Sequence, residues 1–217
     1  MSDNPRMAHP DTAAAERAHL IEHAIEPQLS ERLARVRDRI VARFDDLEVA
    51  GFRGELTLVA EPGRIVDLLR FCRDDPELRC ELLADLSWVH WPGGVHRRIA
   101  QETTGWPIYE EVVEQGRIEL DYVLYSVTHN HRLRARVYLP DEEPEIASVT
   151  DLYASANMME REAFDMVGVR FTGHPNLVRV LMPDDWEGHP HRKDYPLGGV
   201  DVQYKGAVVP PPDQRQY

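Results

Sequence analysis

A dense run of ionisable residues lies near the C-terminal end of the sequence. The segment GHPHRKDYPL, residues 188–197, gathers two histidines, an arginine, a lysine and an aspartate around two prolines. With His174 and Asp185 upstream, His189 and His191 have the right chemistry to bind zinc or a non-haem metal, as in a small metallohydrolase. However, the two histidines flank a proline in an irregular stretch. The sequence predicts no regular scaffold to hold them as ligands.

A helix is predicted just upstream, near residues 150–167, and Gly168 is positioned to close it. Its apolar residues form one stripe: Leu152, Ala156, Met159, Ala163, Met166 and Val167. The remaining surface carries Glu160, Arg161, Glu162 and Asp165. Arg161 and Asp165 are four apart and can pair, so a solvated, ion-paired face is expected. Acid–base or metal chemistry is disfavoured, because Glu160 and Glu162 diverge on a helix.

The stretch after this helix is rich in proline and glycine and short of apolar runs. We therefore predict that residues 171–217 form an extended docking segment, ordered by lying across another surface. In its tail, Val200, Val202 and Tyr204 alternate with polar residues, as in a strand. This strand is expected either to join the edge of another chain's sheet or to fold back on this chain's own sheet.

The upstream sequence predicts an α+β core domain over residues 27–170, preceded by a flexible arm at residues 1–26. Ser30 is a candidate N-cap, and Pro62 a candidate first residue of a second helix. Strands are predicted at 47–50, 55–60, 81–91, 117–127 and again after a turn at His129–Asn130. Residues 92–116 are read as irregular, with a short helix around 95–102. Because strands and helices do not strictly alternate, we expect a mixed or mostly antiparallel sheet with helices packed on it.

Composition narrows the class of protein. The 217 residues are 42% hydrophobic and 29% charged, with a net charge of −13 that disfavours nucleic acid and anionic lipid as partners. No apolar run approaches the ~20 residues of a spanning helix, and the first residues lack an apolar signal core. A cytosolic chain, or one held at a membrane only by partners, is expected. Cys72 and Cys80 are too few for a four-cysteine iron–sulfur site, so plain thiols are expected.

The segment MEREAFDMVGVRFTGHPNLVRVLMPDDWEGHPHRKDYPL resembles the signature region of the C subunit of proton-pumping NADH–quinone oxidoreductase (respiratory complex I, NDH-1). The family pattern falls on Glu160, Arg161, Glu162, Asp165, Gly168, Gly173, His174, Pro175, Asp185, Trp186, Gly188, His189, Pro190, Arg192, Lys193, Asp194, Tyr195, Pro196 and Leu197. His191 stands where the family usually has Leu, and Met158 where an aromatic residue is common. Weaker similarity covers residues 30–150.

The resemblance implies a hydrophilic subunit of the peripheral arm, on the cytoplasmic side of the cell membrane. It would have no catalytic site, cofactor or metal of its own, because FMN and the iron–sulfur clusters belong to partner subunits. Its neighbours would be chiefly the D and B subunits, with the cluster-carrying I subunit. Electron transfer from NADH to quinone, coupled to proton translocation, would belong to the assembled complex. A related subunit of a membrane-bound hydrogenase remains an alternative, as does the metallohydrolase.

The resemblance also implies a set of subunit-interface residues, with Trp186 and Tyr195 as apolar anchors and the Arg192 guanidinium as a bidentate group. The expected interface residues are Glu160, Arg161, Glu162, Asp165, His174, Pro175, Asp185, Trp186, Gly188, His189, Pro190, Arg192, Lys193, Asp194, Tyr195 and Pro196.

Overall fold

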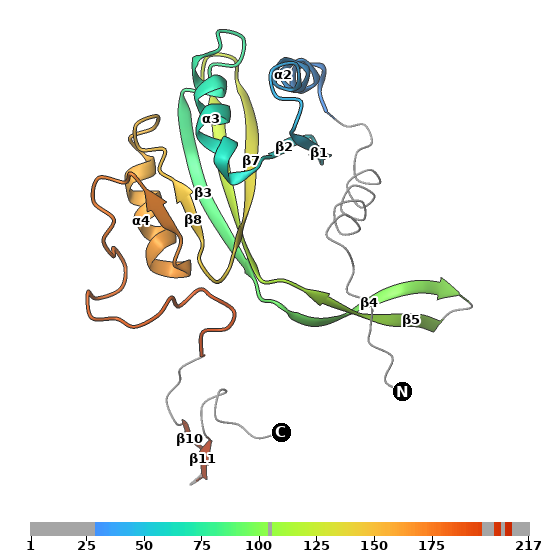
Figure 1. The fold of residues 1–217 in the computed structure, drawn as a ribbon, viewed down its shortest axis with the longest axis vertical. Coiled ribbons are helices and arrows are strands. Elements are labelled where there is room, and N and C mark those ends of the chain that lie inside the picture. Colours follow the sequence, from blue (N-terminus) through green and yellow to red (C-terminus); the bar gives the residue numbers. More distant parts are fainter. Residues whose placement is uncertain (1–28, 104–105, 197–201, 205–206, 210–217) are drawn as a thin grey trace. The chain divides into compact units, whose positions relative to one another are not determined.

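The computed structural model describes residues 29–103, 106–196, 202–204 and 207–209 (Figure 1). The predicted arm at residues 1–26 lies outside them. The chain forms two compact units. The first runs from the start of the described residues to Leu86 and adds Asp121–Val137 and Val149–Ser155. The second comprises Ser87–Leu120, Tyr138–Ser148 and the chain from Ala156 onward.

The largest sheet has five strands in the order β1-β2-β7-β6-β3. These strands are β1 (Glu48–Phe52), β2 (Glu55–Val59), β3 (Leu82–Trp91), β6 (Arg117–Ser126) and β7 (His131–Pro140). β1 pairs with β2 antiparallel, whereas β2 pairs with β7 parallel. The sheet is therefore mixed, and the α+β prediction is confirmed. Along β6 and β7 buried and partly exposed residues alternate, as the sequence indicated.

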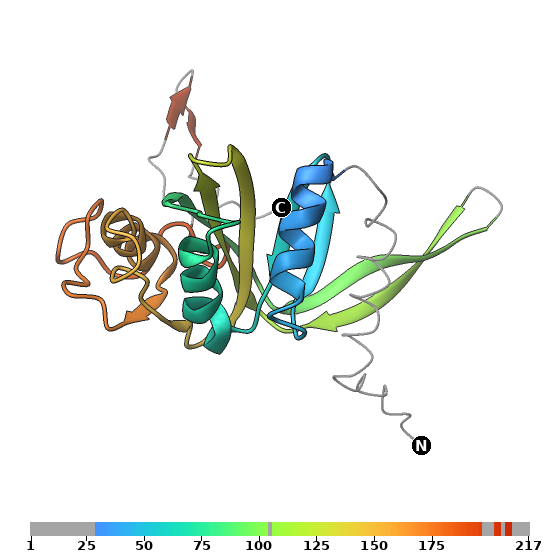
Figure 2. The same cartoon turned by 90° about the horizontal axis from the view of Figure 1, so that it is seen from above.

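Two helices complete the core of the first unit. The helix α2 (Glu31–Val41) begins at Ser30, whose Oγ accepts the Leu33 N–H at 3.4 Å. The helix α3 (Ile65–Asp74) follows a 3-10 turn, η1 (Pro62–Arg64). Both predicted helix starts are thus confirmed. Phe44, just after α2, meets Phe71 of α3 edge to face at 5.6 Å, so the helices share one apolar layer. Seen from above, both run roughly along the strands (Figure 2).

The segment between β3 and β6 corrects the sequence prediction. Residues 92–116 hold an antiparallel hairpin, β4 (Gly94–Thr103) and β5 (Trp106–Glu114), so the expected helix around 95–102 is wrong. The register places Val95 opposite Val113. β-branched residues at facing positions favour strands. This preference appears only when β5 is paired with β4, and the prediction of a helix considered residues 95–102 without that partner strand.

The second unit is built around the helix α4 (Ala156–Val167) and a parallel pair, β8 (Glu145–Ala147) with β9 (Arg170–Thr172). Gly168, with φ +85°, closes α4 as predicted. The helix begins at Ala156, not near residue 150. The residues before it hydrogen-bond elsewhere in the first unit: Tyr153 Oη donates to the Cys80 carbonyl at 2.8 Å, and Ser155 Oγ to the Leu83 carbonyl at 3.0 Å.

The tail contains the strand that the alternation predicted. β10 (Val202–Tyr204) pairs antiparallel with β11 (Ala207–Val209). Among the described residues these two strands pair with each other and not with the five-stranded sheet. Pairing with another chain stays a prediction. No helix in the described part of the chain is long and apolar enough to cross a bilayer.

Candidate functional site

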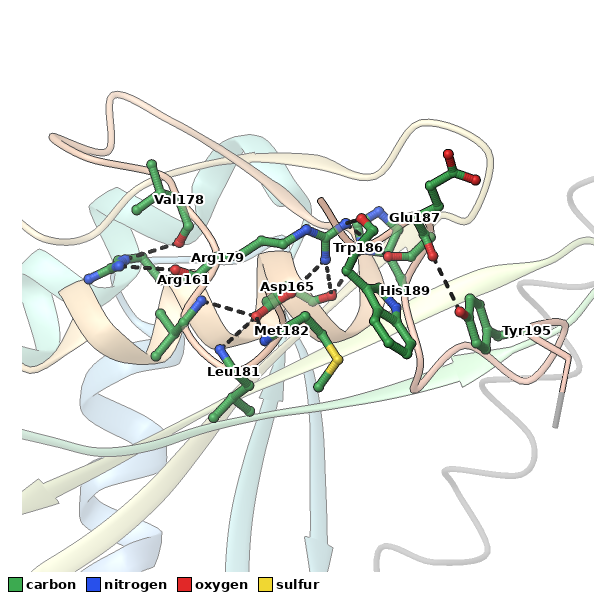
Figure 3. A network of polar contacts seen from close by, with 12 residues as sticks. Arg161, Asp165, Val178, Arg179, Leu181, Met182, Trp186, Glu187, His189 and Tyr195 are labelled. Atoms are coloured by element: carbon green, nitrogen blue, oxygen red, sulfur yellow. Dashed lines mark hydrogen bonds and ion pairs between the residues drawn. The ribbon is translucent and has the colours of Figure 1, made fainter. Parts of the chain in front are cut away.

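Asp165, near the end of α4, is the centre of the signature segment (Figure 3). Its side chain is fully buried. One carboxylate oxygen accepts three successive backbone N–H groups, from Val180 at 3.0 Å, Leu181 at 2.8 Å and Met182 at 2.9 Å. The other accepts Arg179 Nη1 at 2.5 Å. Burial alone raises the pKa of Asp165. The N–H of Met182, the Arg179 guanidinium and the other two N–H groups overcome this effect and lower that pKa to about 2.

Arg179 connects the Asp165 carboxylate to the far end of the loop that follows, at Trp186 and Gly188. Its Nη2 donates to the carbonyl oxygens of Trp186 and Gly188, both at 3.0 Å. The Asp165–Arg179 pair therefore holds the backbone on both sides of residues 181–187. We call this buried pair the clamp. The role of the clamp is structural. Both carboxylate oxygens of Asp165 accept hydrogen bonds from donors of the same chain.

The predicted ion pair between Arg161 and Asp165 is wrong, as is the solvated face for Asp165 and Glu160. Asp165 pairs with Arg179, whereas Arg161 donates to the carbonyls of Val178 at 3.1 Å and Arg179 at 3.2 Å. Glu160 is fully buried and accepts Ser148 Oγ at 2.6 Å. Sequence spacing favoured the local i,i+4 pair, but more distant donors bind both carboxylates: the loop after α4 supplies those of Asp165, and Ser148 supplies that of Glu160.

The segment at 188–196 lies along its own chain. His189 Nδ1 is 3.0 Å from the Asp165 carbonyl, which can only accept, so this nitrogen carries the proton. The His191 N–H donates to the Met166 carbonyl at 2.9 Å. Gly168 makes the approach possible: a Cβ there would lie 2.7 Å from two atoms of the His189 ring. The segment is thus ordered against α4 before any partner is considered.

A second set of contacts holds the segment further along. The Lys193 N–H donates to His90 Nδ1 at 2.8 Å, and His90 Nε2 faces Asp141 Oδ2 at 3.4 Å. Arg192 Nη2 donates to the Asp141 carbonyl at 2.9 Å, and its Nε to Asp194 Oδ1 at 3.3 Å. The guanidinium of Arg192 therefore already has partners within this chain. Its predicted bidentate role toward another subunit remains a prediction.

The metal-site alternative is not supported by the geometry. Within the described residues no group of three or more His, Cys, Asp or Glu side chains is arranged to hold a metal ion. His174 has both ring nitrogens engaged: Nδ1 accepts the Asn176 N–H at 3.0 Å, and Nε2 lies 3.1 Å from the Asn157 carbonyl. The cysteines are also buried, and burial is the main cause of their raised pKa, about 12 for Cys80. Such thiols are poor metal ligands.

Several predicted interface residues are exposed or partly exposed, so a partner can reach them: Glu162, Pro175, Asp185, Trp186, Gly188, Pro190, Lys193, Asp194, Tyr195 and Pro196. Their role at an interface stays a prediction. Three residues that hold the signature segment in place were not predicted from the sequence: Arg179, His90 and Asp141. Only Arg179 gave a signal, as a lone charge in the apolar run NLVRVLM.

Comparisons with known proteins identify the family. The family model described as the respiratory-chain NADH dehydrogenase, 30 kDa subunit, matches residues 58–201. The chain is 41% identical over 192 residues to the C subunit of the NADH-quinone oxidoreductase of Mycobacterium ulcerans, covering 87% of this chain and 72% of that one. It is 46% identical over 164 residues to the C subunit of the Acidothermus cellulolyticus enzyme, covering 76% of each.

The fold is also seen in a solved structure. A chain of the membrane-bound sulfane sulfur reductase, an archaeal respiratory membrane complex, superposes with a TM-score of 0.60 at 22% identity. The match covers 82% of this chain and 100% of that one.

The fold and the matched signature segment define a subunit of a respiratory complex. This chain belongs to the 30 kDa subunit family of the respiratory-chain NADH dehydrogenase, which includes the C subunits of bacterial NADH–quinone oxidoreductases. The resemblance seen in the signature residues is therefore confirmed. With it comes membership of a multisubunit complex I, whose activity involves NAD, quinone and electron transport.

Proposed function

We propose that this chain is a cofactor-free structural subunit in the peripheral arm of NADH–quinone oxidoreductase, on the cytoplasmic side of the cell membrane. Its role is to hold neighbouring subunits in the arrangement that passes electrons from NADH through FMN and iron–sulfur clusters to quinone, coupled to proton translocation. One observation carries the proposal. Asp165 and Arg179 are the charged groups at the centre of the signature segment. They bind each other and backbone groups of the same chain, and do not form a reactive cluster.

The residues of this chain act by positioning. The clamp and the contacts of His189, His191 and Lys193 fix the course of a segment that has little regular structure. A fixed segment loses less conformational entropy on binding than a mobile one, which favours tight association. The exposed residues along it are the proposed contacts with the D and B subunits, and with the I subunit.

The composition supports the absence of a redox centre in this subunit. The sequence contains two cysteines, whereas a cluster held by cysteine alone needs four. Burial raises the pKa of both thiols, which disfavours the thiolate form that binds iron. The FMN and the iron–sulfur clusters of partner subunits would supply the electron-transfer chemistry. This chain would orient the protein surfaces around those cofactors and exclude water from them.

The test compares the isolated chain with the complex. Purified alone and washed with chelator, the chain should be colourless, free of stoichiometric zinc or iron, and inactive toward NADH. An affinity-tagged copy isolated from its natural host should bring down subunits with flavin and iron–sulfur absorbance. A flavin or cluster spectrum in the isolated chain, or one equivalent of zinc or iron, would refute the structural role. Zinc would instead favour the metallohydrolase.

A further inference from the structure

The turn at residues 181–187 has a fixed backbone. On one side, the Leu181 and Met182 N–H groups donate to the buried Asp165 carboxylate. On the other, the Trp186 carbonyl accepts from Arg179. Across the turn, the Trp186 N–H donates to the Pro183 carbonyl at 3.1 Å. Figure 3 shows the side chains of Leu181 and Met182 leading away from the carboxylate that their N–H groups face.

The side chains that this turn displays are unusual for a surface facing water. Leu181 is 54% exposed and Trp186 40% exposed. Between and beside them stand Asp184, Asp185 and Glu187, all exposed, and the turn carries no basic residue. In the described part of the chain none of these three carboxylates forms an ion pair with another residue. The clamp fixes the backbone from which the side chains of Leu181 and Trp186 project.

We propose that the 181–187 turn binds a basic, partly apolar segment of a neighbouring subunit. The proposal rests on the function proposed above, since it needs the assembled complex. Leu181 and Trp186 form the apolar centre of the contact, and the three carboxylates form its rim and pair with Lys or Arg. This is the usual anatomy of a protein interface, with Trp enriched among the residues that dominate its energy.

Charge and rigidity decide between the possible occupants. Three uncompensated carboxylates disfavour an acidic surface, and they disfavour a second copy of this chain, whose net charge is −13. They equally disfavour an anionic lipid surface. Preorganisation by the clamp favours a defined partner surface over a nonspecific apolar one, because the ordering cost is met when the chain folds.

Photo-crosslinking in the assembled complex identifies the occupant. Leu181 is replaced with p-benzoylphenylalanine in a tagged chain, the complex is purified and irradiated, and the products are digested with chymotrypsin for mass spectrometry. The expected product joins position 181 to a single segment of another subunit that contains Lys or Arg beside apolar residues. A product within this chain, with a second copy or with lipid, or no product from an assembled complex, overturns the proposal.

The charge contribution is measured with a matched pair of triple variants. The first is D184N/D185N/E187Q. The control is E142Q/E143Q/E145Q, which removes the same charge from exposed acidic residues of the same unit. Retention of the tagged chain in the complex is followed from about 0.1 to 1 M salt, over which the Debye length falls from about 10 to about 3 Å.

The first triple variant should bind about tenfold more weakly at low salt, as expected for three rim pairs of ordinary strength, with a flatter salt dependence. The control should behave as wild type. Equal behaviour of the two variants contradicts the charge pairing.

The apolar centre is tested with Trp186→Ala. The indole makes no hydrogen bond to any described residue, and the backbone groups that do bond are unchanged by the substitution. The isolated variant should therefore still fold, with only the loss of packing expected for a partly covered indole, whereas retention in the complex, compared below the melting temperature, should fall about thirtyfold, the usual effect of a dominant interface residue. Phe52→Ala, at a residue 64% exposed in the first unit, is the matched control. Undiminished retention of Trp186→Ala would overturn the assignment.

The two proposals fail in distinguishable ways. If the tagged wild-type chain brings down no flavin- or cluster-bearing subunit, the proposed function is wrong. If it does so while the probe at position 181 gives no inter-subunit product, only the docking role of the turn is wrong.

Discussion

Replacing Asp165 with alanine should destabilise the second unit far more than an ordinary surface substitution. The change removes the acceptor of three backbone N–H groups and the ion-pair partner of Arg179, whose side chain is 15% exposed. Removing one partner of a buried ion pair costs about 3–5 kcal/mol. Arg179 keeps three carbonyl partners, those of Asp165, Trp186 and Gly188, so the lower value applies. We expect a loss of about 3 kcal/mol in the free energy of unfolding.

The assay is urea unfolding of the full-length isolated chain, with hydrogen exchange at the loop amides as a local readout. Glu162→Ala is the control, since Glu162 lies on the same helix and forms no ion pair within the described residues. Its effect should stay within about 0.5 kcal/mol. In Asp165→Ala the amides of Val180, Leu181 and Met182 should lose protection. If that variant unfolds like wild type with those amides still protected, the reasoning about the clamp is wrong.

Three further predictions follow from the same contacts. Gly168→Ala should lower the melting temperature more than Gly173→Ala. Both glycines have a positive φ, +85° and +82°, but only at Gly168 would an added Cβ meet His189, at 2.7 Å. Equal shifts in melting temperature would contradict the packing argument. Because the folded-state pKa of Asp165 is lowered to about 2 from 3.8, its contribution is present above about pH 4 and lost as the pH falls toward 2. This contribution to the free energy of unfolding amounts to about 2 kcal/mol. The stabilities of wild type and Asp165→Asn should therefore converge as the pH falls from about 4 toward 2. Stability curves that stay parallel over this pH range would refute the lowered pKa of Asp165. Arg192→Lys keeps the charge but loses the planar fork that reaches two acceptors, so retention in the complex should fall; a silent substitution would show that this geometry is unimportant.

The sequence predicted the parts of the fold that depend on neighbouring residues. Ser30 signals a helix start through a hydrogen bond three residues away, and the alternation along β6 and β7 follows from strand geometry alone. The features it missed depend on distant partners. Arg179 reaches Asp165 only because the loop returns over α4, and the contact between Lys193 and His90 joins residues 103 positions apart. Local spacing carries no information on such contacts.

The same limit explains why the site was only partly predicted. The signature motif identified the correct family, but it did not separate residues that hold the segment in place from those that it displays. Asp165 and Glu160 are buried, while Asp185 and Trp186 are exposed. That division depends on which side chains are covered by segments distant in the sequence, and it appears only in three dimensions.

The central claim, that this chain is a required structural subunit of NADH–quinone oxidoreductase, is tested most directly by deleting it in its host. Inverted membrane vesicles from the deletion strain are assayed for quinone-dependent, NADH-driven proton uptake. Loss of this activity in the deletion strain, restored by the wild-type chain and not by Asp165→Ala, is the predicted result. Vesicles that pump normally without the chain would contradict the account.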